Sequence, residues 1–81
     1  MASYSLRQVS VGDGLYALLL CEDGKPTKWR MVQRRSGPSS VVWCLMQGGR
    51  FRGRFGSREE CYSVMRSLVL EERADDFLVC Q

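Results

Sequence analysis

The sequence predicts an α+β domain, in which an antiparallel sheet of about five to six strands carries one helix on one face, in the order β-β-β-β-β-α-β. Three observations predict this fold. Apolar runs and alternating segments of strand length fill the first two thirds of the chain. Asp23–Gly24 and Gly48–Gly49 have the composition of tight hairpin turns. After Ser57 the apolar residues recur at helical spacing, so the helix belongs to the C-terminal half.

The composition is that of a single small domain covering residues 1–81. Of these residues 44% are hydrophobic and 26% are charged, which is too apolar for a disordered chain. No apolar run approaches the roughly eighteen residues that a membrane-spanning helix needs, so we expect no membrane segment. The start of the chain lacks the basic-then-apolar order of a secretory signal. We therefore expect a soluble, cytoplasmic protein.

The first three strands are expected over residues 3–11, 15–22 and 25–35. In the first strand the apolar phase shifts between Leu6 and Val9, which predicts a bulge or an irregular edge. The second strand is apolar on both faces, as interior strands are.

The two hairpin turns predict which side chains share a face of the sheet. With Asp23–Gly24 central, Leu18 lies opposite Trp29 on the core face, and Ala17 lies opposite Arg30 on the other. With Gly48–Gly49 central, strict alternation sorts the next two strands, residues 41–47 and 50–55, into two sets. The expected core set is Val42, Cys44, Met46, Phe51, Gly53 and Phe55. The expected solvent set is Trp43, Leu45, Gln47, Arg50, Arg52 and Arg54.

The segment that follows has the signals of a helix start. Ser57 and Glu60 form a capping box, in which each side chain reaches the backbone amide of the other residue. Helical spacing of the apolar residues extends the helix from about Arg58 to about Glu72. The apolar residues Phe77–Cys80 are expected to form a last strand.

Positive charge is concentrated in the middle of the chain. Between residues 25 and 58 there are nine basic residues and no acidic one, although the net charge of the whole chain is only +3. Such a block attracts polyanions. The candidate binding residues on a basic sheet face are Lys28, Arg30, Arg34, Arg35, Trp43, Arg50, Arg52 and Arg54. Two alternatives stay open: Trp43 packs in the core, as tryptophan commonly does, or the acidic residues Glu71, Glu72, Asp75 and Asp76 fold back and neutralise the block.

The sequence offers no catalytic or metal-binding constellation. There is no histidine, and the four cysteines are spread along the chain without a C-x-x-C pair, so we expect buried free thiols and no metal site. The glycines around Arg50–Phe55 flank a strand and do not open a helix, which excludes a phosphate-binding loop. We therefore expect a protein that is not an enzyme and binds no cofactor.

A basic sheet face that carries an aromatic side chain is suited to single-stranded nucleic acid, because cations hold phosphates and a ring stacks on a base. This is the function we expect first. The segment Arg52–Gly56, RGRFG, is similar to the aromatic-basic strand motif of RNA-recognition-motif domains, but the strand order differs, so no binding residue is carried over.

Two further functions remain open. In size, single-domain form and lack of catalytic residues the chain resembles the small inhibitors encoded by phages and other mobile elements, including anti-CRISPR proteins. That resemblance implies binding to an acidic surface of a host nucleic-acid-handling protein. The other alternative is a structural subunit that dimerises through a sheet edge, so both a monomer and a homodimer are open.

Overall fold

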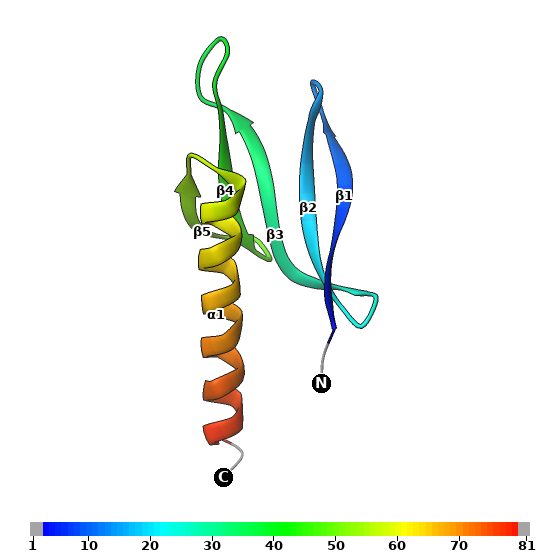
Figure 1. The fold of residues 1–81 in the computed structure, drawn as a ribbon, viewed down its shortest axis with the longest axis vertical. Coiled ribbons are helices and arrows are strands. Elements are labelled where there is room, and N and C mark those ends of the chain that lie inside the picture. The colour runs from blue at the N-terminus through cyan, green and yellow to red at the C-terminus, as the bar shows by residue number, and fades with distance from the viewer. Residues whose placement is uncertain (1–2, 80–81) are drawn as a thin grey trace.

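The computed structural model describes the backbone of residues 3–79 and the side chains of residues 3–73. The predicted α+β fold is confirmed: five antiparallel strands form one sheet and one helix follows them (Figure 1). The strands lie in the sheet in sequence order, so β1 and β5 are the two edges. The elements are β1 (Tyr4–Gly12), β2 (Leu15–Glu22), β3 (Lys25–Arg35), β4 (Val41–Gln47), β5 (Arg50–Phe55) and α1 (Arg58–Val79).

Aspartate-glycine pairs form the first two hairpin turns. Asp13 and Asp23 have φ of 55° and 52°, and the glycines that follow them have φ of 74° and 81°. Two consecutive residues with positive φ give the turn whose twist matches that of the paired strands. Asp and Gly tolerate this conformation better than other residues, so the local sequence determines where the chain reverses.

The β2–β3 hairpin keeps the predicted faces but not the predicted register. Glu22 pairs with Lys25 as expected, but Leu18 then lies opposite Met31, because the register shifts between Leu19 and Cys21. Thr27 provides hydrogen-bond partners for the backbone at this irregularity: its hydroxyl donates to the carbonyl of Leu20 at 2.7 Å and accepts from the amide of Trp29 at 3.2 Å. The register shifts by two residues, which leaves every side chain on its original face.

The helix begins where the capping signal predicts and ends later than expected. The Ser57 hydroxyl accepts from the amide of Glu60 at 3.2 Å, which caps α1. The expected last strand is wrong for Phe77–Val79, which continue α1, while Cys80 lies outside the described residues. Neither glycine nor proline interrupts the chain between Glu72 and Val79, so no local signal stops the helix.

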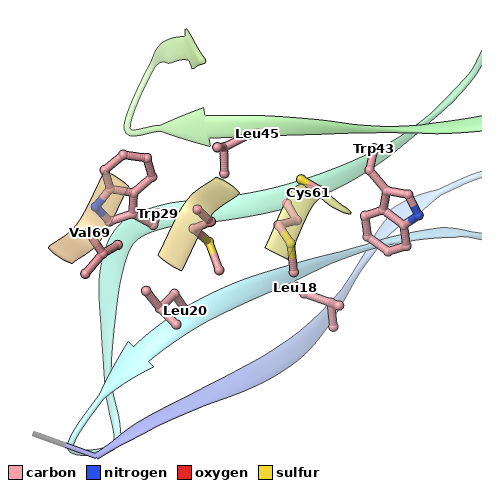
Figure 2. Close-up of a cluster of buried hydrophobic side chains, with 9 residues drawn as sticks. Leu18, Leu20, Trp29, Trp43, Leu45, Cys61 and Val69 are labelled. Atoms are coloured by element: carbon pink, nitrogen blue, oxygen red, sulfur yellow. The ribbon is translucent and has the colours of Figure 1, made fainter. Parts of the chain in front are cut away.

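The core lies between α1 and the sheet, and α1 packs over β3, β4 and β5. Residues of α1 at intervals of four are fully or almost fully buried: Cys61 and Met65 at 0% exposure and Val69 at 6%. Figure 2 shows the two tryptophans at opposite ends of the cluster, Trp29 toward Val69 and Trp43 toward Cys61. The sheet contributes Leu18, Leu20, Trp29, Met31, Trp43 and Leu45.

β1 is an exposed edge strand. It pairs with β2 without interruption from Tyr4 to Ser10, so the bulge that we expected between Leu6 and Val9 is absent, and the irregularity lies between Ser10 and Gly12. The apolar phase shifts because Leu6 faces the helix side while Val9 faces the opposite side. β1 thus presents apolar residues on both faces of the sheet.

Candidate binding face of the sheet

A β-bulge in β5 decides which arginines lie together. Met46 pairs with Phe51, but the next residue along β4, Leu45, pairs with Gly53, so β5 contains one extra residue at this point. Gly53 takes φ of 148°, a conformation that side-chain-bearing residues rarely adopt. The extra residue reverses the alternation of β5, so the residues after the bulge lie on the opposite faces from those they would have in a regular strand.

The faces predicted for β4 and β5 are therefore wrong for most residues. Trp43 and Leu45, expected on the solvent face, are core residues with 7% and 0% exposure. Phe51, expected in the core, is 58% exposed. In β4 the alternation holds, but the wrong phase was assigned to the core, because β4 is apolar on both faces and gives no signal of its own. Strict alternation was the false assumption in β5. Of the expected core set, Phe55 does pack against the core cluster, since it follows the bulge.

The sheet face opposite α1, called the open face below, is apolar with a basic rim. It contains two hollows, of about 470 Å³ and about 340 Å³, which adjoin at Arg34 and Met46 and are together called the depression below. Among the residues whose side chains are described, no helix residue and no Asp or Glu lines either hollow. The apolar lining residues are Val9, Val11, Ala17, Leu19, Val32, Val42, Cys44, Met46 and Phe51. The basic residues along these hollows are Arg30, Arg34, Arg35 and Arg54.

Three of the predicted basic residues lie together on the open face. Arg30 and Arg34 come from β3 and Arg54 from β5, after the bulge. Arg35 lies at the end of the depression, where its guanidinium donates to the carbonyl of Asp13 at 2.8 Å. Arg50 is exposed next to the β4–β5 turn and lines neither hollow. The block of positive charge is therefore divided between the two faces of the sheet.

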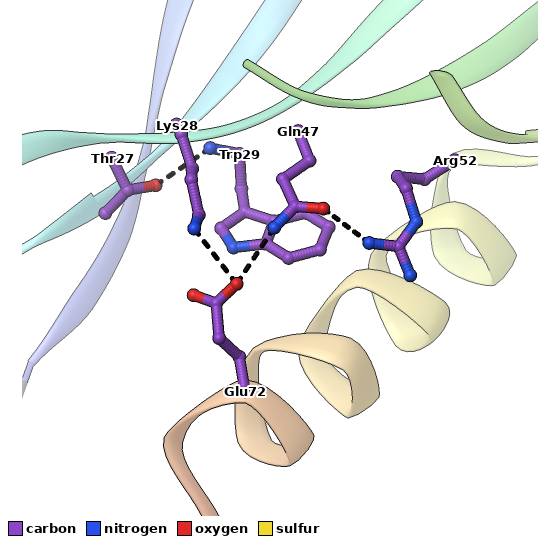
Figure 3. A network of polar contacts seen from close by, with 6 residues as sticks. All are labelled: Thr27, Lys28, Trp29, Gln47, Arg52 and Glu72. Atoms are coloured by element: carbon purple, nitrogen blue, oxygen red, sulfur yellow. Dashed lines mark hydrogen bonds and ion pairs between the residues drawn. The ribbon is translucent and has the colours of Figure 1, made fainter. Parts of the chain in front are cut away.

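The other predicted cations, Lys28 and Arg52, lie on the helix side in a polar cluster (Figure 3). Lys28 Nζ is 3.0 Å from Glu72 Oε2, and Gln47 Nε2 donates to the same oxygen at 2.8 Å. The Arg52 guanidinium donates to Gln47 Oε1, and its central carbon lies 5.7 Å from the centroid of the Trp29 ring. This cluster ties α1 to β3, β4 and β5.

The acidic end of α1 partly neutralises the basic block. Glu72 pairs with Lys28, as the alternative interpretation of the sequence proposed, and Glu71 lies near Arg52 around a shared hollow. Asp75 and Asp76 lie outside the residues whose side chains are described. The next residue of the helix, Arg73, forms an ion pair with Glu22 of β2. The described acidic residues of the helix therefore neutralise cations on the helix side of the sheet, and they do not reach the cations of the open face.

Trp43 does not belong to a basic surface. Its ring meets that of Tyr16 edge-on, with centroids 5.5 Å apart and an interplanar angle of 77°. A buried ring in such a contact has no free face for a base. On the open face the exposed aromatic side chain is instead Phe51. Phe51 shares a face with Met46, as the turn predicts, but that face is the open one and not the core. A glycine inside a strand, Gly53, was the sequence signal that Phe51 and Phe55 do not share a face.

The described cysteines are buried free thiols. Cys21, Cys44 and Cys61 are all buried and unpaired. The pKa of the Cys61 thiol is raised to about 11, mainly by burial and in addition by the nearby Cys44 and Glu60. Among the residues that the structure describes, no group of three or more His, Cys, Asp or Glu side chains is placed to hold a metal ion. Within the described residues, no helix is both long and apolar enough to cross a membrane.

Comparisons of this chain with family models, with curated proteins and with solved structures found no match.

Proposed function

We propose that this chain is a non-catalytic binding module whose open face binds an acidic surface of a partner protein. The observation that carries the proposal is the composition of the open face. Its floor is apolar across all five strands, Arg30, Arg34 and Arg54 lie along it, and no carboxylate of residues 3–73 lines the depression. Protein interfaces combine an apolar centre with a polar rim, and arginine is enriched in them.

The exposed apolar residues of the open face favour a partner. Val9, Val11 and Phe51 are 40%, 48% and 58% exposed and lie on the same face. Contiguous apolar surface of this kind commonly marks an interaction site. Burial of apolar area supplies affinity, while the arginines select an acidic partner and speed its approach.

The charge of the open face argues against pairing two open faces in a homodimer. Such a dimer would bring Arg30, Arg34 and Arg54 of one copy toward the same residues of the other. Like charges that are desolvated together are unfavourable. An acidic protein partner, such as a nucleic-acid-handling protein that a phage or mobile-element inhibitor would cover, avoids this repulsion.

Single-stranded nucleic acid is the second candidate, and one observation favours it. Phe51 and Arg54 line the same hollow, and Phe51 is the exposed aromatic residue of that face. A ring beside a cation suits a base beside its phosphate. The remaining described lining of the depression, however, contains no aromatic residue and so offers no further ring for stacking. For this reason the protein partner is our first proposal.

A pull-down from extracts of the source cells tests the proposal with a matched pair of charge reversals. Arg54→Glu changes the open face, whereas Arg50→Glu makes the same change at an exposed position outside the depression. A protein that binds the open face should be retained in stoichiometric amount by the wild type and by Arg50→Glu. It should be lost with Arg54→Glu and should survive nuclease treatment.

Two outcomes would overturn this function. Equal retention by both variants would place the contact elsewhere on the molecule. Loss of the protein after nuclease treatment would leave nucleic acid as the direct partner. In that case a labelled dT oligonucleotide should bind the purified chain with an affinity that falls steeply with salt, by counterion release, and Arg54→Glu should weaken this binding more than Arg50→Glu.

We further propose that the module acts in the cytoplasm. The supporting observation is that Cys21, Cys44 and Cys61 are free thiols. Proteins of reducing compartments keep their thiols in this form, whereas small secreted domains commonly use them in disulfides.

A further inference from the structure

The two edges of the sheet differ in their protection against pairing with another strand. β5 has six residues, contains a bulge and carries Arg50, Arg52 and Arg54. β1 has nine residues, pairs regularly with β2 from Tyr4 to Ser10, and carries a single charged side chain, Arg7. Short length, bulges and charges are the features by which edge strands avoid pairing. β1 has almost none of these features.

The side chains of β1 are also incompletely covered on both faces. Leu6 is 39% exposed on the helix side, and a hollow separates it from Arg58, Glu59 and Tyr62 at the start of α1. Val9 is 40% exposed on the open face. A strand added beside β1 would cover apolar residues on both faces and would satisfy the outward backbone groups of the edge.

We propose that β1 pairs with β1 of a second copy of this chain, antiparallel and about a two-fold axis, so that two sheets join into one. This inference concerns the edge and does not depend on the partner of the open face. In such a pair the opposed side chains lie on the same face. A two-fold axis that passes through Gln8 places side chains of the same face opposite each other. It also pairs β1 along its whole length, with Tyr4 opposite Gly12 of the second copy.

The charge pattern of β1 supports this register. With the axis at Gln8, Arg7 lies opposite Val9 of the second copy, and Leu6 lies opposite its Ser10. With the axis at Arg7, two arginines would oppose each other directly, which destabilises a strand pair. The strand therefore pairs with its own copy without placing a charge against a like charge.

The shape of the molecule also accommodates the joined sheet. α1 packs over β3, β4 and β5, so the two helices would lie toward the far sides of the joined sheet (Figure 1). Val9 and Val11 line the open-face depression next to the edge. In the dimer, the two depressions would therefore continue into each other across the axis, with these valines of both copies at its centre.

Sedimentation equilibrium on the full chain tests the proposal over a range of about 5 to 500 µM, in which edge-paired dimers of modest affinity dissociate. The wild type should shift from 9.3 kDa toward twice that mass. Gln8→Lys and Gln8→Glu should each raise the dimer dissociation constant about fivefold, because like charges then meet at the axis. An equimolar mixture of the two variants should regain the wild-type affinity by forming a heterodimer.

Matched controls separate this interface from others. Gln8 is exposed, so neither substitution should alter the circular dichroism or the urea midpoint of the monomer. Ser63→Lys and Ser63→Glu, at an exposed position of α1, should leave dimerisation unchanged. In the wild type, hydrogen exchange of the outward β1 amides should slow as concentration rises, while exchange in β5 should not.

Three results would overturn the proposal. The first is a monomer over the whole concentration range. The second is a dimer whose dissociation constant does not respond to either charge at Gln8. The third is concentration-dependent protection of β5 amides instead of β1 amides, which would assign the contact to the opposite edge.

Discussion

Arg52 and Arg54 lie two residues apart on β5, but removal of their charges should affect different properties of the protein. The guanidinium carbon of Arg52 lies 5.7 Å from the Trp29 ring centroid, and the group donates to Gln47 in the cluster that holds α1. Arg54 lines the open face, and within the described part of the chain no hydrogen bond or ion pair of its side chain is observed. We therefore predict that Arg52→Gln reduces stability, whereas Arg54→Gln leaves stability nearly unchanged.

The magnitudes follow from the contacts that are lost. A cation–π contact at a partly exposed site contributes about 0.5–1 kcal/mol, and a hydrogen bond contributes about 0.5–1.5 kcal/mol. Arg52→Gln should thus lower the free energy of unfolding by about 1–2 kcal/mol and the midpoint temperature by about 4–16 °C in a domain of this size. Arg54→Gln removes an exposed charge and should change the free energy of unfolding by less than about 0.5 kcal/mol.

Urea denaturation followed by tryptophan fluorescence measures both variants directly, because Trp29 and Trp43 are both buried in the folded state. A double-mutant cycle of Arg52→Gln with Trp29→Phe should show a coupling energy of about 0.5–1 kcal/mol. Equal destabilisation by Arg52→Gln and Arg54→Gln would refute the reasoning. That result is the one expected of a regular β5 strand, in which the two arginines share a face.

Two further predictions concern the bulge and the buried thiol. Gly53→Ala should destabilise the domain by about 1–3 kcal/mol, because φ of 148° is strained for alanine and its Cβ would lie 3.0 Å from the Phe55 ring. Chemical denaturation measures this loss of stability. Gly49→Ala is the control, because a Cβ at that position meets nothing within 4 Å. The Cys61 pKa is raised from 9.0 to about 11, so the folded state holds the thiol proton more tightly than the unfolded state. The resulting stability is fully present below pH 9 and is lost as the pH rises toward 11. The urea midpoint should therefore fall more steeply over this range in the wild type than in Cys61→Ala, and identical slopes would contradict the assignment.

The sequence predicts the local features of this fold well. Asp23–Gly24 marks a turn because few other residue pairs take two positive φ angles, and Ser57 marks the helix start because its hydroxyl caps the Glu60 amide. Each of these signals acts over four residues or fewer. The start of α1 and the strand order were therefore predictable, while its end at Val79 was not, since no stop signal precedes it.

The faces of β4 and β5 were not predictable in the same way. Val41–Gln47 is apolar in both phases, so alternation alone does not say whether Trp43 or Cys44 faces the core. The bulge at Gly53 then reverses the phase of β5 by one residue, which moves Arg54 to the open face and leaves Arg52 beside Trp29. Phe51 precedes the bulge and shares the open face with Met46. A one-residue change of register inverts every later side chain, so a small local error becomes a large error in the predicted site.

The two candidate interaction surfaces have a common physical origin. A sheet whose strands are apolar on both faces needs a covering layer on each side, and a domain is commonly built from such layers. The described chain contributes one helix, which covers one face of β3, β4 and β5. The helix leaves the open face uncovered. This face extends from Phe51 on β5 to Val9 and Val11 on β1, where it meets the unprotected edge of the sheet. The same valines would be buried by a partner on the open face or by a second β1 strand, so each surface follows from one incomplete covering of one sheet.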